Sequence, residues 1–149
     1  HALGGGAMLA AARAALAEFA QPPLLIAVTI LTSSDAQGLA EVGMPTDVAQ
    51  QVKRLACLAQ HHGLHGVVCS GLEVDQIRAQ CGEHFVTVVP GIRLHPQSNN
   101  DDQKRIMTPR AACENGAHYL VIGRPIHQAH NPQNIIDQIN LDISNCPVS

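Results

Sequence analysis

The sequence predicts an α/β fold in which parallel strands alternate with helices. Four nearly continuous apolar runs lack the strict alternation of half-exposed strands, and such runs are typical of parallel strands covered on both faces. The segments between them have helical periodicity. Aromatic residues, which β-sandwiches favour, make up only 2% of the chain. The 149 residues fit a single domain, 1–149.

The first half of the chain predicts two helices and two strands. A helix at 6–20 precedes a strand at 24–31, and a helix at 46–62, with Thr46 as its N-cap, precedes a strand at 66–70. Each helix carries one apolar stripe that we expect to be buried. The stripe residues are Met8, Ala12, Leu16 and Phe19 in the first helix and Val48, Val52, Leu55 and Leu58 in the second.

The second half continues the alternation. The expected elements are a short helix at 73–81, a strand at 85–92, a helix from Pro109 to a stop at Gly116, a strand at 119–122 within the apolar run 119–126, and a helix from Pro132. Thr108 and Asn131 are the expected N-caps of the last two helices, because each precedes a proline at the first helical position. The buried face of the last helix is expected at Ile135, Ile136, Ile139 and Ile143.

This order of elements allows two architectures. Repeated right-handed βαβ units build either an open, doubly wound sheet or a (β/α) barrel. A complete eight-stranded barrel takes about 250 residues, so four strands would form roughly half to two-thirds of one. The sequence opens without Met, and His1 resembles the last residue of a preceding strand. We therefore expect that an upstream segment is missing.

Charge and composition exclude several classes of function. The net charge of -3 comes without a basic stripe or an aromatic platform, so nucleic-acid binding has no support. No apolar run approaches the roughly 20 residues of a bilayer span. The five cysteines are odd in number and include no CxxC pair, which favours a reducing, cytoplasmic setting over a disulfide framework. Cys69 lies inside an expected strand and is predicted to be a buried free thiol.

The nine histidines do not predict a metal site. His61, His62 and His65 form an HHxxH pattern, and His127 and His130 form HxxH. No cysteine or carboxylate stands at ligand spacing from either group, and histidines at a helix C-terminus are explained by the helix dipole. The serines lack the GxSxG pattern of a hydrolase. We expect neither a metal nor a hydrolase triad.

The candidate site lies at the carboxyl ends of the strands, where ligands bind in both architectures. Gly123 and Arg124 stand in the last strand-ending turn; glycine lets the backbone approach a ligand, and the planar guanidinium of arginine matches phosphate oxygens. Arg93 ends the preceding strand in a similar turn and could reach the same region. A phosphate site is the favoured interpretation. A surface arginine after an ordinary turn is the alternative.

Two further candidates come from neighbouring loops. Gln103 lies in a polar segment that exceeds the usual βα loop, so a lid is expected, and its amide could bridge a base or phosphate after closure. A solvated loop without ligand contact is the alternative. Thr32, Ser33 and Ser34 present hydroxyls at the end of the first strand. They could bind a heterocycle or cap the following helix.

Several strand-end motifs together resemble the orotidine 5'-phosphate decarboxylase family, in its bacterial branch. The motifs are "LLIAVTILTS", "GVVCS", "VPGIR", "DDQKRIMTP" and "VIGRPI", in the family's order over essentially the whole chain. The opening "HALGGGAML" resembles the end of that family's fourth strand and the helix after it. The resemblance implies a partial (β/α)8 TIM barrel, covering roughly strands 5 to 8 and the end of strand 4.

The resemblance also implies an activity. The family consists of homodimeric lyases that decarboxylate orotidine 5'-monophosphate to UMP in pyrimidine biosynthesis, with no metal or organic cofactor. Thr32 would contact the pyrimidine side of the site, and Gln103 would belong to the phosphate lid. Arg124, with the backbone N–H of Gly123, would bind the phosphate. Arg93 matches a further arginine among the family's ligand contacts.

One feature departs from the family pattern. Its catalytic D-x-K-x-x-D motif is absent, and the only lysines are Lys53 and Lys104. Lys104 follows Asp102 as D-x-K, but the second Asp is lacking and the segment belongs to the lid. We therefore expect the isolated chain to be inactive and to need an N-terminal half-barrel as its complement. The alternatives are a phosphosugar-binding TIM-barrel enzyme of another reaction type and a non-catalytic phosphate-binding module with a complete flavodoxin-like sheet.

Overall fold

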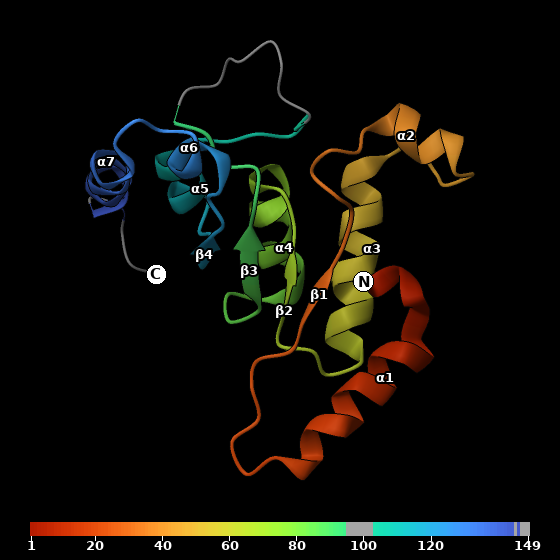
Figure 1. Ribbon diagram of the computed structural model, residues 1–149. Coiled ribbons are helices and arrows are strands. Elements are labelled where there is room, and N and C mark those ends of the chain that lie inside the picture. The colour runs from red at the N-terminus through yellow and green to blue at the C-terminus, as the bar shows by residue number, and fades with distance from the viewer. Residues whose placement is uncertain (95–102, 145, 147–149) are drawn as a thin grey trace.

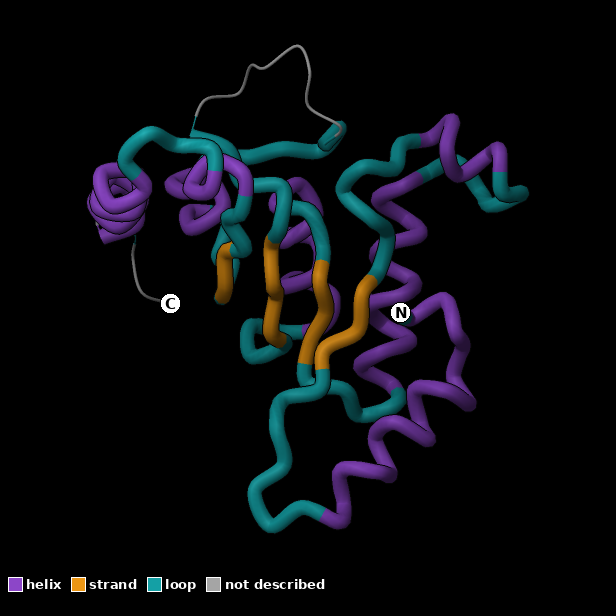
Figure 2. Tube along the Cα trace, viewed as in Figure 1, coloured by secondary structure: helices purple, strands orange, loops and turns teal. Residues whose placement is uncertain are grey.

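The computed structural model describes residues 1–94, 103–144 and 146, and it contains one parallel sheet (Figure 1). The strands are β1 (Ile26–Val28), β2 (Gly66–Val68), β3 (Val86–Val89) and β4 (Tyr119–Leu120). They lie side by side in chain order (Figure 2), with Gly66 opposite both Ile26 and Val86. The prediction of parallel strands alternating with helices is confirmed. The paired segments are shorter than the apolar runs, because each run continues into the turn beyond its strand.

The helices expected from the sequence are present. They are α1 (Gly5–Ala15), α3 (Val48–His61), α4 (Val74–Cys81), α5 (Pro109–Glu114) and α7 (Pro132–Ser144), and 3-10 helices occur at Ala2–Gly4, Leu16–Glu18 and Gly71–Glu73. The Thr108 hydroxyl accepts a hydrogen bond from the Ala111 backbone N–H at 3.3 Å, which confirms the predicted cap of α5. No helix in the described part of the chain combines the length and the apolar character needed to cross a membrane.

Two short helices lie outside the prediction. The first, α2 (Ala36–Glu41), begins after Asp35, whose carboxylate accepts a hydrogen bond from the Gly38 backbone N–H at 2.9 Å. The alternative in which Thr32, Ser33 and Ser34 cap the helix after the first strand is therefore wrong, because Asp35 caps it. The second, α6 (Arg124–His127), follows the last strand within the apolar run 119–126, where the sequence predicted a turn; Pro125, with its fixed φ and no N–H to donate, suits the first turn of a helix.

Two expected starts are also corrected. Helix α3 begins after Asp47 rather than Thr46, since the Asp47 carboxylate accepts from the Gln50 backbone N–H at 2.9 Å. An N-cap side chain bonds the second or third N–H of its helix, and Thr46 stands one residue too early for this. His1 belongs to no strand of the described sheet, and a 3-10 helix follows it directly.

The apolar face of α1 differs from the expected stripe. Leu9 is its buried side chain, whereas Met8 and Phe19 are 39% and 59% exposed. The cause is a close approach between α1 and the end of α3: a Cβ added to Gly6 would lie 2.4 Å from Nε2 of His62. Gly6 and Leu9 are three residues apart and share one helix face, which is the face turned inward.

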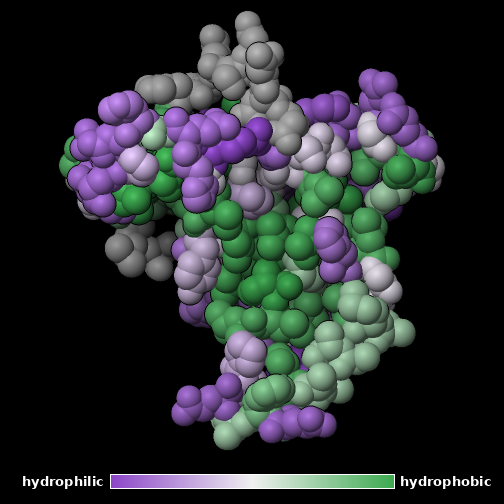
Figure 3. Space-filling view, in the orientation of Figure 1, coloured by the Kyte–Doolittle hydropathy of each residue, from purple (hydrophilic) through white to green (hydrophobic). Residues whose placement is uncertain are grey.

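Helices cover one face of the sheet and leave the other open. Figure 1 shows α3 and α4 behind the strands, on the side where Ala27 and Val67 are buried. Figure 3 shows apolar atoms gathered over the opposite face. That face carries the strand side chains of alternate positions, Val28, Val68, Val88, Tyr119 and Val121. A complete doubly wound sheet has helices on both faces, so the described residues form one wall of a barrel rather than a flavodoxin-like sheet.

Histidines stabilise the amino ends of two strands. Nδ1 of His65 accepts a hydrogen bond from the Leu25 backbone N–H at 2.8 Å, beside β1 and β2. Nδ1 of His118 accepts from the Thr87 backbone N–H at 3.2 Å and lies 3.0 Å from the buried Thr87 hydroxyl. The sequence pattern placed His65 with His61 and His62 at the C-terminal end of a helix. His65 also bonds the backbone just before β1, which that placement did not predict. Among the described residues, no group of three or more His, Cys, Asp or Glu side chains could hold a metal ion.

Replacing His118 with alanine should lower the free energy of unfolding by about 1–3 kcal/mol, because the Thr87 backbone N–H loses its acceptor and the buried Thr87 hydroxyl keeps only its bond to the residue 118 N–H. Urea unfolding followed by circular dichroism measures this change. The matched control is His84→Ala, which removes an exposed imidazole from the same approach to β3 and should change stability by less than about 0.5 kcal/mol. Equal stability of the two variants would show that the Thr87–His118 contact contributes nothing.

Candidate functional site

The carboxyl ends of β1, β2 and β3 surround a cavity of about 230 Å³. Val28, Ile30 and Val68 are among its apolar lining residues. Thr32, Ser33 and Gln103 supply polar side chains from two segments of the chain. The cavity therefore lies at the edge of the sheet where the sequence predicted a ligand site, and it combines an apolar wall with hydroxyl and amide groups.

Thr32 and Gln103 meet in this cavity although they are 71 positions apart. The Thr32 hydroxyl donates a short hydrogen bond to Oε1 of Gln103. The Thr32 carbonyl accepts from the backbone N–H groups of Lys104 and Arg105, each at 3.2 Å. The strand end and the segment that follows the expected lid are thus held together through both side-chain and main-chain contacts. Residues 95–102, the central part of that expected lid, lie outside the described residues.

The glycine that this packing requires is Gly91. Its φ is +77°, and a Cβ there would lie 3.0 Å from the Arg105 carbonyl oxygen and 3.6 Å from Cβ of Thr32. Gly123, by contrast, has φ of -108°, and an added Cβ would meet nothing within 4 Å. The close backbone approach at this edge of the sheet therefore occurs at Gly91, in the preceding strand-ending turn.

A buried ion pair stands beneath the cavity, and sequence reasoning missed it. Arg105 donates from Nη1 to Oε1 of Glu73 and from Nη2 to the carbonyls of Ile30 and Leu31, both at 3.0 Å. Arg105 is 8% exposed and Glu73 is 4% exposed. One guanidinium therefore connects the end of β1, the start of α4 and the segment after Gln103.

Ser70 extends this network to the end of β2. Its backbone N–H donates to Oε2 of Glu73 at 3.0 Å, and its hydroxyl lies 3.3 Å from both the Leu72 backbone N and the Arg105 carbonyl oxygen. This is a capping box, whose S-x-x-E signature is present in the sequence as "SGLE". The signature identifies the helix start, but nothing in it indicates the arginine 32 positions away.

Burial controls the ionisation of the groups around this pair. It raises the pKa of Glu73, while the neighbouring guanidinium of Arg105 and the hydrogen bonds to the carboxylate oppose that rise. Burial also raises the pKa of Cys69 to about 12, with a further contribution from the charge of Glu73. Cys69 is 1% exposed, so the prediction of a buried free thiol is confirmed.

Arg93 lies beside a second cavity, of about 180 Å³, lined by Arg93, Ile106, Met107, Thr108 and Ala111. Its backbone N–H donates to the Met107 carbonyl at 2.9 Å, and Nη1 donates to the Ile92 carbonyl at 2.8 Å. Thr32 and Gln103 are not among the residues that line this second cavity. The structure therefore does not place Arg93 in the cavity formed around Thr32.

Gly123 and Arg124 stand beyond the end of β4, where Gly123 is the N-cap of α6. The Gly123 carbonyl accepts from the backbone N–H groups of Ile126 and His127, at 2.9 and 3.0 Å. Arg124 is exposed, and neither residue lines the two cavities above. Figure 1 shows α6 at the same end of the sheet as the segment that follows Gln103.

The motifs at this edge agree with comparisons to known proteins. A family model described as "Orotidine 5'-phosphate decarboxylase / HUMPS family" matches residues 1–139. The chain belongs to this family. Orotidine 5'-phosphate decarboxylases from Neisseria meningitidis serogroup B and Chromobacterium violaceum are 51% and 52% identical to it. These matches span 140 and 144 residues, which are 94% and 97% of this chain but only 57% and 58% of the relatives.

The chain thus spans a little over half the length of these relatives. The crystal structure of orotidine 5'-phosphate decarboxylase from Lactobacillus acidophilus is similar to it with a TM-score of 0.76 and 36% sequence identity. That similarity covers 96% of this chain and 61% of the other. The resemblance inferred from the strand-end motifs is confirmed, and so is the partial parallel α/β barrel.

Replacing Arg105 with methionine should lower the free energy of unfolding by about 3–5 kcal/mol, because the Glu73 carboxylate would remain buried without its cation. The double variant Arg105→Met, Glu73→Met should recover part of this loss, since no isolated charge is left. Denaturant unfolding of the single and double variants measures the coupling.

Lys104→Met is the matched control for this cycle. It removes the adjacent positive charge. Nζ of Lys104 lies 2.7 Å from Oδ2 of Asp35, but both side chains are partly exposed, and exposed ion pairs contribute little to stability. If Lys104→Met destabilises the chain as strongly as Arg105→Met, the importance given to the buried pair is wrong.

Proposed function

We propose that this chain takes part in the decarboxylation of orotidine 5'-monophosphate to UMP, the last step of pyrimidine nucleotide synthesis. The observation that carries the proposal is the contact between Thr32 and Gln103 at the carboxyl edge of the sheet. It joins a hydroxyl and an amide beside an apolar cavity, in a chain whose family match runs over residues 1–139. We also propose that the active protein is a cytoplasmic homodimer.

Within this proposal the site has two ends. Thr32 contacts the pyrimidine, and Gln103 bridges the base and the phosphate when the lid closes. Arg124 binds the 5'-phosphate through its guanidinium, with the Gly123 N–H beside it, since a planar fork of donors suits phosphate oxygens. Arg93 adds positive charge on the approach to the phosphate. These roles follow the family resemblance, and the exposure of Arg124 at the same end of the sheet is compatible with them.

Phosphate binding far from the reacting bond can assist the reaction. Binding energy from a non-reacting group can support lid closure, and closure excludes water and strengthens the electrostatic stabilisation of charge that develops at the pyrimidine. The bond between the ring and its carboxylate then breaks, CO2 leaves, and the ring carbon takes up a proton. The residues described here bind and orient the nucleotide on one side of that carbon.

The proton donor must come from elsewhere. In the family pattern a lysine flanked by aspartates supplies it, and these 149 residues contain no D-x-K-x-x-D motif. Nζ of Lys104 pairs with Asp35 at 2.7 Å, and Lys53 lies on α3, which covers the face of the sheet opposite the open one (Figure 1). We propose that an N-terminal half-barrel carrying the motif completes the site, and that its strands cover the open face of the sheet.

The chain by itself should form no UMP from orotidine 5'-monophosphate, because it lacks the flanked lysine. Adding the N-terminal half of a bacterial orotidine 5'-phosphate decarboxylase as a separate polypeptide should restore turnover, and a lysine-to-alanine change in that half should abolish it. Loss of the absorbance of the substrate reports the reaction. UMP formation by the chain alone would refute the requirement for a complement.

UMP should protect the chain or its complemented form against thermal unfolding, whereas sugar phosphates should not. Arg124→Ala should weaken UMP binding at least about tenfold, because a charged hydrogen bond to phosphate is lost. The control Arg110→Ala removes another exposed arginine, which pairs with Glu114 on α5. Calorimetric titration measures both variants, and an equal effect of the two would contradict the phosphate role of Arg124.

A further inference from the structure

Four of the five cysteines form two pairs that are distant in the sequence, and all five lie among the described residues. Cys57 contributes to the raised pKa of Cys81, and Cys146 to that of Cys113, so the two members of each pair lie near each other. The odd number of cysteines and the lack of a CxxC motif favoured a reducing setting over a disulfide framework. The fold therefore brings together cysteines whose spacing in the sequence does not suggest a disulfide.

We propose that Cys57 and Cys81 form a reversible dithiol–disulfide site that links α3 to α4. Cys57 lies within α3, and Cys81 is the last residue of α4. The two helices pack beside each other on the same face of the sheet (Figure 1). The proposal does not depend on the decarboxylase function and can be tested on the chain alone.

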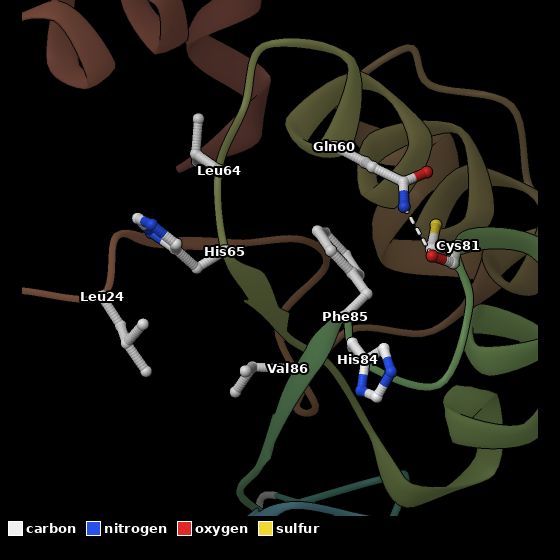
Figure 4. Close-up of a pocket in the computed structure, with 8 residues that line it drawn as sticks. All are labelled: Leu24, Gln60, Leu64, His65, Cys81, His84, Phe85 and Val86. Carbon is white, nitrogen blue, oxygen red and sulfur yellow. Dashed lines mark hydrogen bonds between the residues drawn. The ribbon is translucent and has the colours of Figure 1, made fainter.

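A hydrogen bond beside Cys81 joins the two helices that carry these thiols. Nε2 of Gln60, one helical turn after Cys57, donates a hydrogen bond to the Cys81 carbonyl at 2.5 Å (Figure 4). The backbone turns immediately afterwards at Gly82, whose φ is +88°. The last residue of α4 is therefore fastened to the turn of α3 that follows Cys57, which brings the backbones that carry the two thiols together.

Small molecules can reach this pair. Cys57 and Cys81 are both half-buried, unlike the fully buried Cys69. Cys81 lines an open cavity of about 340 Å³ together with Gln60, Leu64 and Phe85 (Figure 4). A peroxide or a small disulfide fits a space of this size.

The oxidant is a peroxide, and the step balances without any bound cofactor. One thiolate attacks a peroxide oxygen, so that an S–O bond forms, the O–O bond breaks, and a sulfenic acid and water result after proton transfer. The second thiol then attacks the sulfenic sulfur. The S–S bond forms, the S–O bond breaks, and a second water leaves. Two thiols lose two electrons and two protons, and one hydrogen peroxide becomes two waters.

The surroundings make this site slow at neutral pH. Burial raises the pKa of Cys81 to about 11, the nearby Cys57 raises it further, and the charge of Lys53 opposes the rise. Because the thiolate is the attacking species, the rate of cross-linking should keep increasing from about pH 7 to about pH 10. A site of this kind responds to sustained oxidation rather than to brief pulses.

The disulfide would close a loop that contains β2 and the capping box of Ser70 and Glu73. Restricting this loop in the unfolded chain stabilises the folded state. Oxidation should therefore raise the melting temperature by roughly 5–10 °C. Reduction should return it to its starting value.

The decisive experiment is peptide mapping after oxidation with hydrogen peroxide and blocking of the remaining thiols. Trypsin places Cys57 in peptide 55–78 together with Cys69, and Cys81 in peptide 79–93. The Cys69→Ala variant leaves Cys57 as the only cysteine of its peptide, so a linked pair of peptides identifies the bond directly. In the unsubstituted chain, fragmentation of the linked peptides makes the same assignment. We expect this linked species, and we expect a phosphine reductant to separate it.

Matched variants test the consequence. In a Cys113→Ser background, which removes the second pair, Cys81→Ser should lose the oxidation-dependent rise in melting temperature, whereas Cys69→Ala should retain it. Mixing isotope-labelled and unlabelled chains before oxidation distinguishes a bond within one chain from a bond between two. Recovery of Cys57 and Cys81 as separate sulfinic acids, or as links between labelled and unlabelled chains, would overturn the proposal.

Discussion

The guanidinium of Arg105 is the group on which the carboxyl edge of this sheet depends. Beyond Thr29, whose backbone N–H still donates to the Val68 carbonyl, the chain leaves the ladder with β2. The Ile30 carbonyl then needs a donor from elsewhere, since a buried carbonyl without a partner is costly, and the Leu31 carbonyl, which accepts from the Ser34 N–H, can take a second donor. Nη2 of Arg105 supplies both bonds while Nη1 pairs with Glu73. A lysine ammonium lacks the planar, forked set of donors that this arrangement uses. Nε of Arg105 is buried without a partner among the described residues, a further cost that the other bonds must offset.

The position of the candidate site follows from this arginine. Gln103 precedes Arg105 by two residues, so fixing Arg105 also fixes the backbone that carries Gln103 to Thr32. Gly91 permits the close approach of that backbone. Removing either charge of a buried pair leaves the other isolated, which makes the network cooperative rather than a sum of independent contacts. The geometry of the cavity and the stability of this edge are therefore expected to change together.

Local sequence patterns predicted the elements of the fold but not the contacts that shape the site. The apolar runs located all four strands, and Thr108 with Pro109 located the start of α5. These features depend on neighbours in the chain. The bond between Arg105 and Glu73, the packing at Gly91 and the pairing of Cys57 with Cys81 depend on residues brought together by the turns of the sheet. Phe19 was misplaced for the same reason, because the close approach of α1 to α3 decides which side of α1 is buried.

The open face of the sheet is where the proposed N-terminal half-barrel would bind, and its binding would also complete the catalytic site. Tyr119 and Val121 are 56% and 50% exposed on that face, in a parallel sheet whose strands are ordinarily covered on both sides. Burying apolar area of this kind is favourable by about 25 cal/mol per Å² before the entropic cost of association. Under the proposed function, the half-barrel that carries the missing lysine is also the segment that buries this face. Assembly of the barrel and completion of the catalytic site would then be one event, in which the apolar face supplies affinity and the carboxyl edge supplies the nucleotide contacts.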